Sequence, residues 1–397
     1  MRWDGRGPAP AAKAHALLLA LTASPLVVHI PYSLSIVLHS ALAVYVGCWR
    51  SVKTEPPQES MSDGDAYRFP LVGSCVLFGL FLSFKFLPKG LVNALLAAYI
   101  VSIGAFVVVS TVLPFCENFF PPDQRDRVVR LPRIPAVPRL GLHDPISLEP
   151  TLPELVLGVP AVALGAWYFA TKSWLPNNLL GLSFSIVGIE HLSLGSTKTG
   201  AILLAGLFLY DVFWVFCTPV MVSVARNFDA PIKLLFPRIP LRGAAAIAAG
   251  AEANSFAMLG LGDIVIPGLF VAMMLRHDVE RRFASSYFPT AFWAYCAGVA
   301  ATIGVMNVFK AAQPALLYIV PCVLGALAAH AWLRGELGMM AAWKEAHVLE
   351  EEAAAAAEEA AAAANKEGGG AAKKGKAAAA AAAGGGGGSG SGSKKTK

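Results

Sequence analysis

Apolar residues along this chain gather in blocks of about 20, separated by shorter polar stretches. A helix of that length crosses a hydrocarbon core of about 30 Å, so each block predicts a transmembrane helix. The pattern therefore predicts an all-α polytopic membrane protein with nine spans. The predicted spans cover residues 30–49, 69–87, 91–114, 153–171, 176–194, 200–222, 255–275, 287–309 and 314–333.

A further apolar segment, "HALLLALTASPLVV", precedes the first span. It is shorter than a span and follows three basic residues, which is typical of a signal peptide or of a stretch at the membrane interface. Pro25 and Pro31 predict that no continuous helix runs from this segment into the first span.

The composition changes again near Glu345, where Ala/Glu-rich and Gly/Ser-rich sequence begins. Such sequence cannot form a packed core and is typical of a mobile tail. We therefore divide the chain into an N-terminal segment, a first membrane bundle, a catalytic membrane bundle and a cytosolic low-complexity tail. These parts cover residues 1–29, 30–194, 195–336 and 337–397.

The overall composition agrees with a membrane protein. The 397 residues are 56% hydrophobic and 15% charged, with a mean hydropathy of +0.57, whereas soluble domains are about 25% charged. A basic face beside anionic lipid accounts for the net charge of +6 and requires no nucleic-acid partner. The six cysteines lie within or beside apolar blocks without a CxxC pair, so we expect free thiols.

Basic residues favour one orientation in the membrane. Five arginines lie between Glu117 and Pro153, and three more follow the seventh span within residues 276–282. With nine spans, both loops fall on the side of the C-terminus, which the positive-inside rule makes cytosolic. Four basic residues after the sixth span lie on the opposite side, so the bias is modest. The N-terminus is then luminal or external.

Two aspartates lie inside the predicted spans. Asp211 is the one charged residue of "AILLAGLFLYDVFWVFCTPVMV", and Asp263 is the ninth residue of the seventh span. Consecutive spans are antiparallel, so aspartates near their midpoints lie at the same depth and can face each other. A charged group at this depth is costly and indicates function.

Two carboxyl groups in contact in a low dielectric share a proton and titrate as a pair. One can then act as a base that activates water while the other acts as an acid, as in aspartic proteases. Gly260 and Gly262 leave room for another backbone beside Asp263, and Tyr210 brings a hydroxyl next to Asp211.

Other functions fit the same positions. Channels and transporters coupled to protons also place carboxylates at the membrane midplane, and a buried aspartate pair can simply hold helices together. A catalytically silent membrane scaffold is a third class. Position alone gives a hydrolase and a transporter equal weight, and cleavage of a transmembrane reporter peptide separates these alternatives.

The motifs "YD" at 210–211, "GLGD" at 260–263 and "QPALLYIVP" at 313–321 resemble the three signatures of the GxGD intramembrane aspartyl proteases. The stretches "LFLYDVFWVF" and "NFDAPIKLLFP" are similar to the signal peptide peptidase branch of that family rather than to presenilin. The resemblance runs from about Pro31 to Glu336, with the motifs on the sixth, seventh and ninth spans in the family's order.

The resemblance implies that Asp211 and Asp263 form the catalytic pair, and that Pro314, Ala315 and Leu316 lie near the active site and help to hold substrate. The implied activity is endoproteolysis of remnant signal peptides and some type II transmembrane segments in the endoplasmic reticulum membrane, without a metal or organic cofactor. The implied partners are these peptides, membrane lipids, a second copy of the chain and quality-control proteins of the endoplasmic reticulum.

Two further pairs of residues are weaker candidates for functional sites than the aspartate pair. Glu190 and His191 are adjacent, but no third ligand follows at helical spacing and no HExxH motif occurs, so we expect a structural or substrate-gating role. Lys394 and Lys395, in the terminal "KKTK", resemble a dilysine retrieval signal. Cytosolic coat proteins read such a signal, which agrees with a cytosolic C-terminus.

Overall fold

The computed structural model divides into two compact units, Met1–Trp343 and Lys344–Lys397. It describes residues 9–28, 30–52, 59–116, 119–130, 149–228, 230–238, 256–309 and 313–358. Within the second unit, residues 346–358 are helical, and Lys344 forms an ion pair with Glu352 at 2.6 Å. The dilysine at 394–395 lies outside the described residues.

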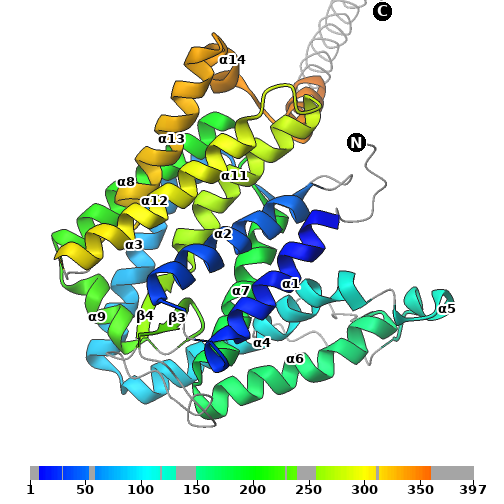
Figure 1. Ribbon diagram of the computed structural model, residues 1–397, viewed down its shortest axis with the longest axis vertical. Helices are drawn as coiled ribbons and strands as arrows, with labels where there is room; N and C mark the ends of the chain where they lie inside the picture. Colours follow the sequence, from blue (N-terminus) through cyan, green and yellow to red (C-terminus); the bar gives the residue numbers. More distant parts are fainter. Residues whose placement is uncertain are drawn as a thin grey trace, which may run out of the picture. The chain divides into compact units, whose positions relative to one another are not determined.

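The first unit is a helical bundle (Figure 1). The elements of its N-terminal part are α1 (Ala9–Ala23), η1 (Ser24–Leu26), α2 (Tyr32–Ser51), β1 (Glu59–Ser60), α3 (Asp63–Phe86), α4 (Lys89–Cys116), α5 (Pro122–Arg125), α6 (Leu152–Thr171) and α7 (Trp174–His191). As predicted from the two prolines, α1 and α2 are separate helices.

The C-terminal part of the unit carries the three sequence motifs. Its elements are β2 (Leu192–Ser193), α8 (Thr197–Phe216), α9 (Val220–Asn227), β3 (Lys233–Pro237), β4 (Phe256–Gly260), α11 (Gly262–Glu280), α12 (Tyr287–Phe309), α13 (Leu316–Leu333) and α14 (Leu337–Ala342). The predicted sixth span ran to residue 222, but α8 ends at Phe216. Pro219, which has no amide hydrogen to continue that helix, precedes α9.

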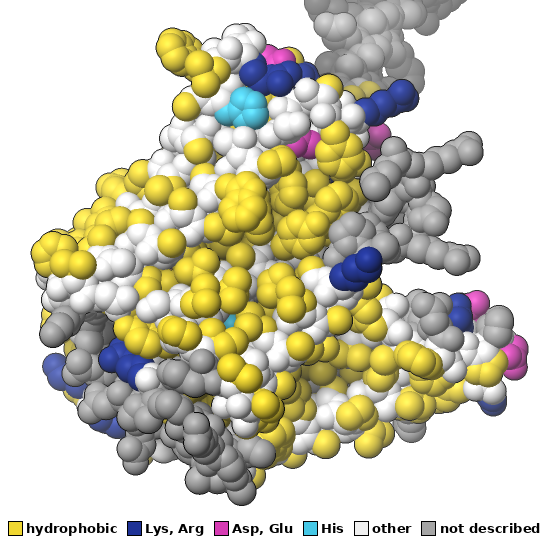
Figure 2. Space-filling view, in the orientation of Figure 1, with side chains coloured by type: hydrophobic (Ala, Val, Ile, Leu, Met, Phe, Trp, Pro, Cys, Tyr) yellow, Lys and Arg dark blue, Asp and Glu magenta, His cyan; other side chains and the backbone are white. Residues whose placement is uncertain are grey.

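Seven helices of the described residues are long and apolar enough to cross a membrane, namely α2, α3, α4, α6, α8, α12 and α13. On α3 and α4, large apolar side chains such as Leu71, Leu95 and Phe106 are exposed. Figure 2 shows apolar side chains over much of one face, as a lipid-facing surface requires. Helices α7 and α11 fill the positions of the fifth and seventh predicted spans but are more polar and largely buried.

The hydrophobic pattern failed to predict a two-stranded antiparallel sheet. Strand β3 pairs with β4 in a register that sets Lys233 opposite Gly260 and Pro237 opposite Phe256. The prediction that a helix covers 255–275 is therefore wrong at its start, since residues 256–260 form β4. A short apolar run does not by itself distinguish a buried strand from a helix.

Close packing holds the helices of the bundle together. Helices α12 and α13 lie side by side, as do α4 and α6, and α2 contacts both α7 and α11 (Figure 1). At Gly298 of α12, an added Cβ would lie 2.7 Å from the Cα of Ile319 on α13. Only glycine permits this approach of one helix to the backbone of the other.

Candidate active site

Helix α8 brings Asp211 into the bundle. The helix begins after Ser196, whose side chain accepts the Thr199 amide hydrogen at 3.0 Å. At the start of α8, Lys198 forms an exposed ion pair with Asp63 of α3 at 2.8 Å. Asp211 lies in the second half of α8 and is 4% exposed.

The antiparallel pair of β3 and β4, here called the hairpin, positions Asp263. Its second strand ends at Gly260, and the Leu261 amide then donates to the Ile232 carbonyl at 3.0 Å. Asp263 follows as the second residue of α11. It therefore lies in the first turn of a helix, not near the middle of one as predicted, and its side chain is partly accessible.

Two asparagines at the start of α7 hold this hairpin in place. Asn178 accepts the Leu235 amide hydrogen at 2.8 Å and donates to the Leu235 carbonyl at 2.8 Å. Asn177 donates to the Lys233 carbonyl at 2.7 Å. The side chain of Asn178 thus bonds to β3 as a neighbouring strand would. This role was not predicted from the sequence, although two adjacent polar residues inside a predicted span are an unusual feature that indicates one.

The two carboxyl groups lie close enough to interact electrostatically, and their helices, α8 and α11, are in contact. Tyr295 of α12, which is fully buried, donates to the backbone carbonyl of Asp263 at 3.4 Å. This tyrosine was not among the predicted site residues, because nothing in its local sequence distinguishes it from a core aromatic residue.

The "PAL" residues meet Asp211 at the start of α13. The amide of Leu316, the first residue of α13, donates to the Asp211 Oδ2 atom at 3.1 Å. Pro314, Ala315 and Leu316 are all buried. The predicted ninth span began at Pro314, but α13 begins two residues later, at Leu316. The two segments that meet here are 105 residues apart in the sequence.

The remaining predicted site residues have distinct environments. A Cβ at Gly260 would lie 3.3 Å from the Asp263 Oδ2 atom, whereas one at Gly262 would meet nothing within 4 Å. Gly260 is therefore the glycine that gives the Asp263 carboxyl room. The ring of Tyr210 packs against α3, 3.7 Å from where a Cβ would lie at Gly73.

Glu190 has a structural environment. It forms an ion pair with Arg50 at 2.8 Å, and both side chains are largely buried. Arg50 also donates to the carbonyls of Ser110 and Thr111 on α4. The Ser110 carbonyl lacks its usual helical donor because residue 114 is proline. Among the described residues no group of three or more His, Cys, Asp or Glu side chains is placed to hold a metal ion.

A bundle of membrane-crossing helices with two interacting carboxyl groups inside it defines the class of the protein. Its helices are those of a polytopic membrane protein, and two neighbouring carboxyl groups are the groups that aspartic proteases use for acid–base chemistry. The signal peptide peptidase family model matches residues 53–347. The chain therefore belongs to the signal peptide peptidase family and is an intramembrane aspartic protease.

Individual relatives agree with this assignment. The chain is 42% identical to the signal peptide peptidase of Homo sapiens over 321 residues, which cover 79% of this chain and 83% of that protein. The Mus musculus protein of the same name matches over the same shares. Intramembrane protease 2 of Caenorhabditis elegans is 48% identical over 194 residues, covering 45% of this chain and 40% of that protein.

Proposed function

We propose that this protease cleaves remnant signal peptides, and some type II transmembrane segments, within the membrane of the endoplasmic reticulum. Its membership of the signal peptide peptidase family supports this choice of substrate. The proposed orientation is a luminal N-terminus and a cytosolic C-terminus, which the distribution of basic loop residues supports. A second copy of the chain and quality-control proteins are proposed partners.

The proposed catalytic groups are Asp211 and Asp263. One carboxylate takes a proton from water, whose oxygen attacks the scissile carbonyl carbon, while the other carboxyl group gives its proton to the carbonyl oxygen. The tetrahedral intermediate then collapses, the C–N bond breaks and the leaving nitrogen takes up a proton. The observation that carries this proposal is the hydrogen bond from Leu316 to Asp211, which links the carboxyl group to the "PAL" segment.

The substrate must unwind locally before this reaction, because a transmembrane helix shields its own carbonyls and satisfies its own amides. Residues that weaken helices should therefore favour cleavage when they lie near the scissile bond. Asp263, in the first turn of α11, is only partly buried, whereas Asp211 is buried, and this difference favours the approach of water from the side of Asp263.

Cleavage of a transmembrane reporter peptide by the purified full chain in detergent tests this function. Asp211→Asn and Asp263→Asn should each abolish cleavage, since an amide keeps the size of the side chain but cannot shuttle a proton. Asp63→Asn is the matched control, because it changes an exposed aspartate at the start of α3. The active protein should also bind a mimic that carries a hydroxyl in place of the scissile carbonyl. Substantial cleavage by either catalytic-site variant would refute the pair.

A further inference from the structure

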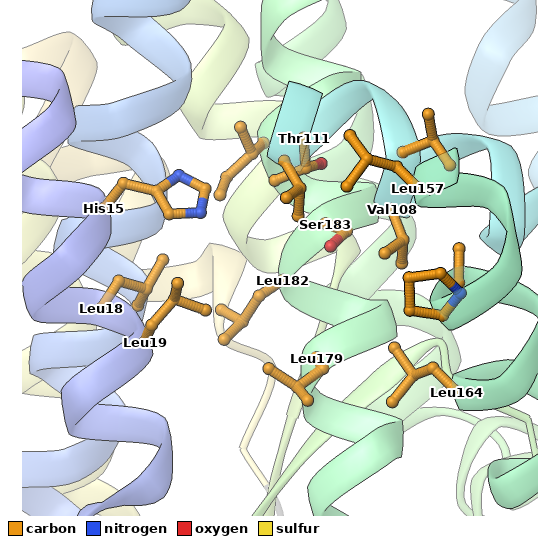
Figure 3. Close-up of a pocket in the computed structure, with 15 residues that line it drawn as sticks. His15, Leu18, Leu19, Val108, Thr111, Leu157, Leu164, Leu179, Leu182 and Ser183 are labelled. Atoms are coloured by element: carbon orange, nitrogen blue, oxygen red, sulfur yellow. The ribbon is translucent and has the colours of Figure 1, made fainter. Parts of the chain in front are cut away.

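A cavity of about 280 Å³ lies between α1, α4, α6 and α7, outside the site of the aspartates (Figure 3). Most of its wall is aliphatic, including Leu18, Val108, Leu157, Leu164, Leu182 and Ile186. None of its lining residues belongs to α8, α11 or α13. The volume is close to the lower end of small-molecule pockets, at about 300 Å³.

Polar groups face this apolar space from two sides. Figure 3 shows the ring of His15 projecting from α1 toward α7 and α4, with the Ser183 side chain of α7 in the same cavity. His15 is 3% exposed and Ser183 is 8% exposed. The His15 Nδ1 atom has no hydrogen-bond partner in the part of the chain that the structure describes. A buried polar atom without a partner is costly, so His15 is the side chain of this wall that would gain most from a new hydrogen bond.

The charge state of His15 limits what that ligand can be. Burial, followed by the nearby Arg50 guanidinium, lowers the pKa of His15 to about 4. The ring is therefore neutral at physiological pH, with one nitrogen that donates and one that accepts a hydrogen bond. Arg50 itself is bound to Glu190 and to two carbonyls. A neutral hydroxyl, which both donates and accepts, matches the ring better than a charged head group.

We propose that this cavity binds a membrane lipid with an apolar body and a neutral hydroxyl head, whose hydroxyl bonds to His15. A sterol and a diacylglycerol share this chemistry. The outer face of α6 exposes apolar residues such as Val159 and Val162, so the ligand would enter from the hydrocarbon phase. The apolar wall would hold the body of the lipid at about 0.8 kcal/mol for each buried methylene.

Photoaffinity labelling of the purified full chain in phosphatidylcholine vesicles tests the proposal. The probes are a photoreactive sterol, a photoreactive diacylglycerol and the same two molecules with the hydroxyl converted to a methyl ether. At least one hydroxyl probe should label peptides of α1, α4, α6 or α7 saturably, and its methyl ether should label them far more weakly. Labelling by one hydroxyl probe identifies the source of the ligand. Equal labelling by the ethers, or none at this cavity, would overturn the proposal.

Variants locate the binding within the cavity. His15→Phe keeps a ring of similar size and should weaken labelling about tenfold, the effect of one lost hydrogen bond to a buried group. His15→Gln keeps a donor and an acceptor and should retain labelling, while Ala161→Phe should block it by filling the space. Leu17→Phe, at an exposed position of α1 that does not line the cavity, is the control. Thermal unfolding shows whether each variant folds. If a variant does not fold, the comparison of hydroxyl and ether probes on the wild-type protein still tests the proposal.

Discussion

Asp211 accepts the amide hydrogen of Leu316, so a single hydrogen bond joins the sixth and ninth predicted spans at the proposed reaction centre. The sequence indicated both partners, because the aspartate is anomalous in an apolar block and the "PAL" residues resemble a family signature. It did not indicate the contact, which is made by a backbone amide. Every residue except proline has a backbone amide, so the residue type does not show which amide will bind a carboxyl group. Residue patterns therefore cannot predict such a contact.

Replacing both aspartates by asparagine is expected to reduce cleavage no further than either single replacement. The base and the acid act in the same step, so the loss of either removes the whole effect of the pair. Initial rates of the purified single and double variants on one reporter peptide provide the measurement. A double variant tenfold slower than both single variants would show that the two carboxyl groups contribute independently.

Glu190→Gln is expected to destabilise the fold by about 3–5 kcal/mol, because it leaves the buried Arg50 charge without its counter-ion. Asp63→Asn breaks an exposed ion pair with Lys198 and should cost less than about 1 kcal/mol. Thermal unfolding of both variants in the same detergent compares them. Equal midpoints would mean that the Arg50–Glu190 pair contributes little.

At the scale of the element, apolar blocks predicted the helices well where each block was long and bounded by polar residues. The hairpin of β3 and β4 was missed because its second strand runs directly into the apolar block of α11. This error affected the predicted site, because Asp263 was expected near the middle of a helix and lies instead in the first turn of α11. Sequence periodicity could not have located this boundary, because Phe256–Gly260 is short and apolar.

The segment before α13 provides a test of its own. Pro314→Leu should reduce cleavage more than it reduces expression, because the buried proline lies two residues before the amide that bonds to Asp211. The control is Pro321→Leu, at an exposed position on α13 outside the three PAL residues, and it should leave the cleavage rate near that of the wild type. Normal cleavage by purified Pro314→Leu protein would refute a role for the motif.

Helix packing is tested at two glycines of α12. Gly298→Ala places a Cβ against the backbone of α13 and should destabilise the bundle by about 1–3 kcal/mol. Gly304→Ala meets nothing within 4 Å and should be neutral or stabilising, since alanine favours a helix. Unfolding midpoints of the two variants should therefore move in opposite directions or differ clearly. A similar loss for both would contradict the close approach of α12 and α13.

For the whole molecule, the spacing of the apolar blocks, together with the composition, predicted a multi-pass membrane protein, and the family match confirms it. The proposed orientation is based on a modest bias of loop charges, and the proposed compartment is based on the family and on a four-residue terminal sequence. Neither feature involves packing, so the fold does not constrain them.

The terminal lysines give the compartment a direct test. Lys394→Ala together with Lys395→Ala should let the protein leave the endoplasmic reticulum, provided that the C-terminus is cytosolic. The control replaces Lys373 and Lys374, which have the same charge in the same tail, and should not change the location. Immunofluorescence with an antibody against the chain, beside compartment markers, measures both. Unchanged location of the first variant would refute the retrieval signal without affecting the protease.

The pairing of β3 with β4 also determines where the chain tolerates a change of length. The paired strands flank residues 239–255, and doubling the length of a connecting segment costs only about 0.6 kcal/mol. An insertion there leaves the register of the strands intact. One residue added between Gly260 and Asp263 would instead turn the carboxyl group by about 100° around the axis of α11. Related chains should therefore vary freely in length before Phe256 and hold a fixed count from Phe256 to Asp263.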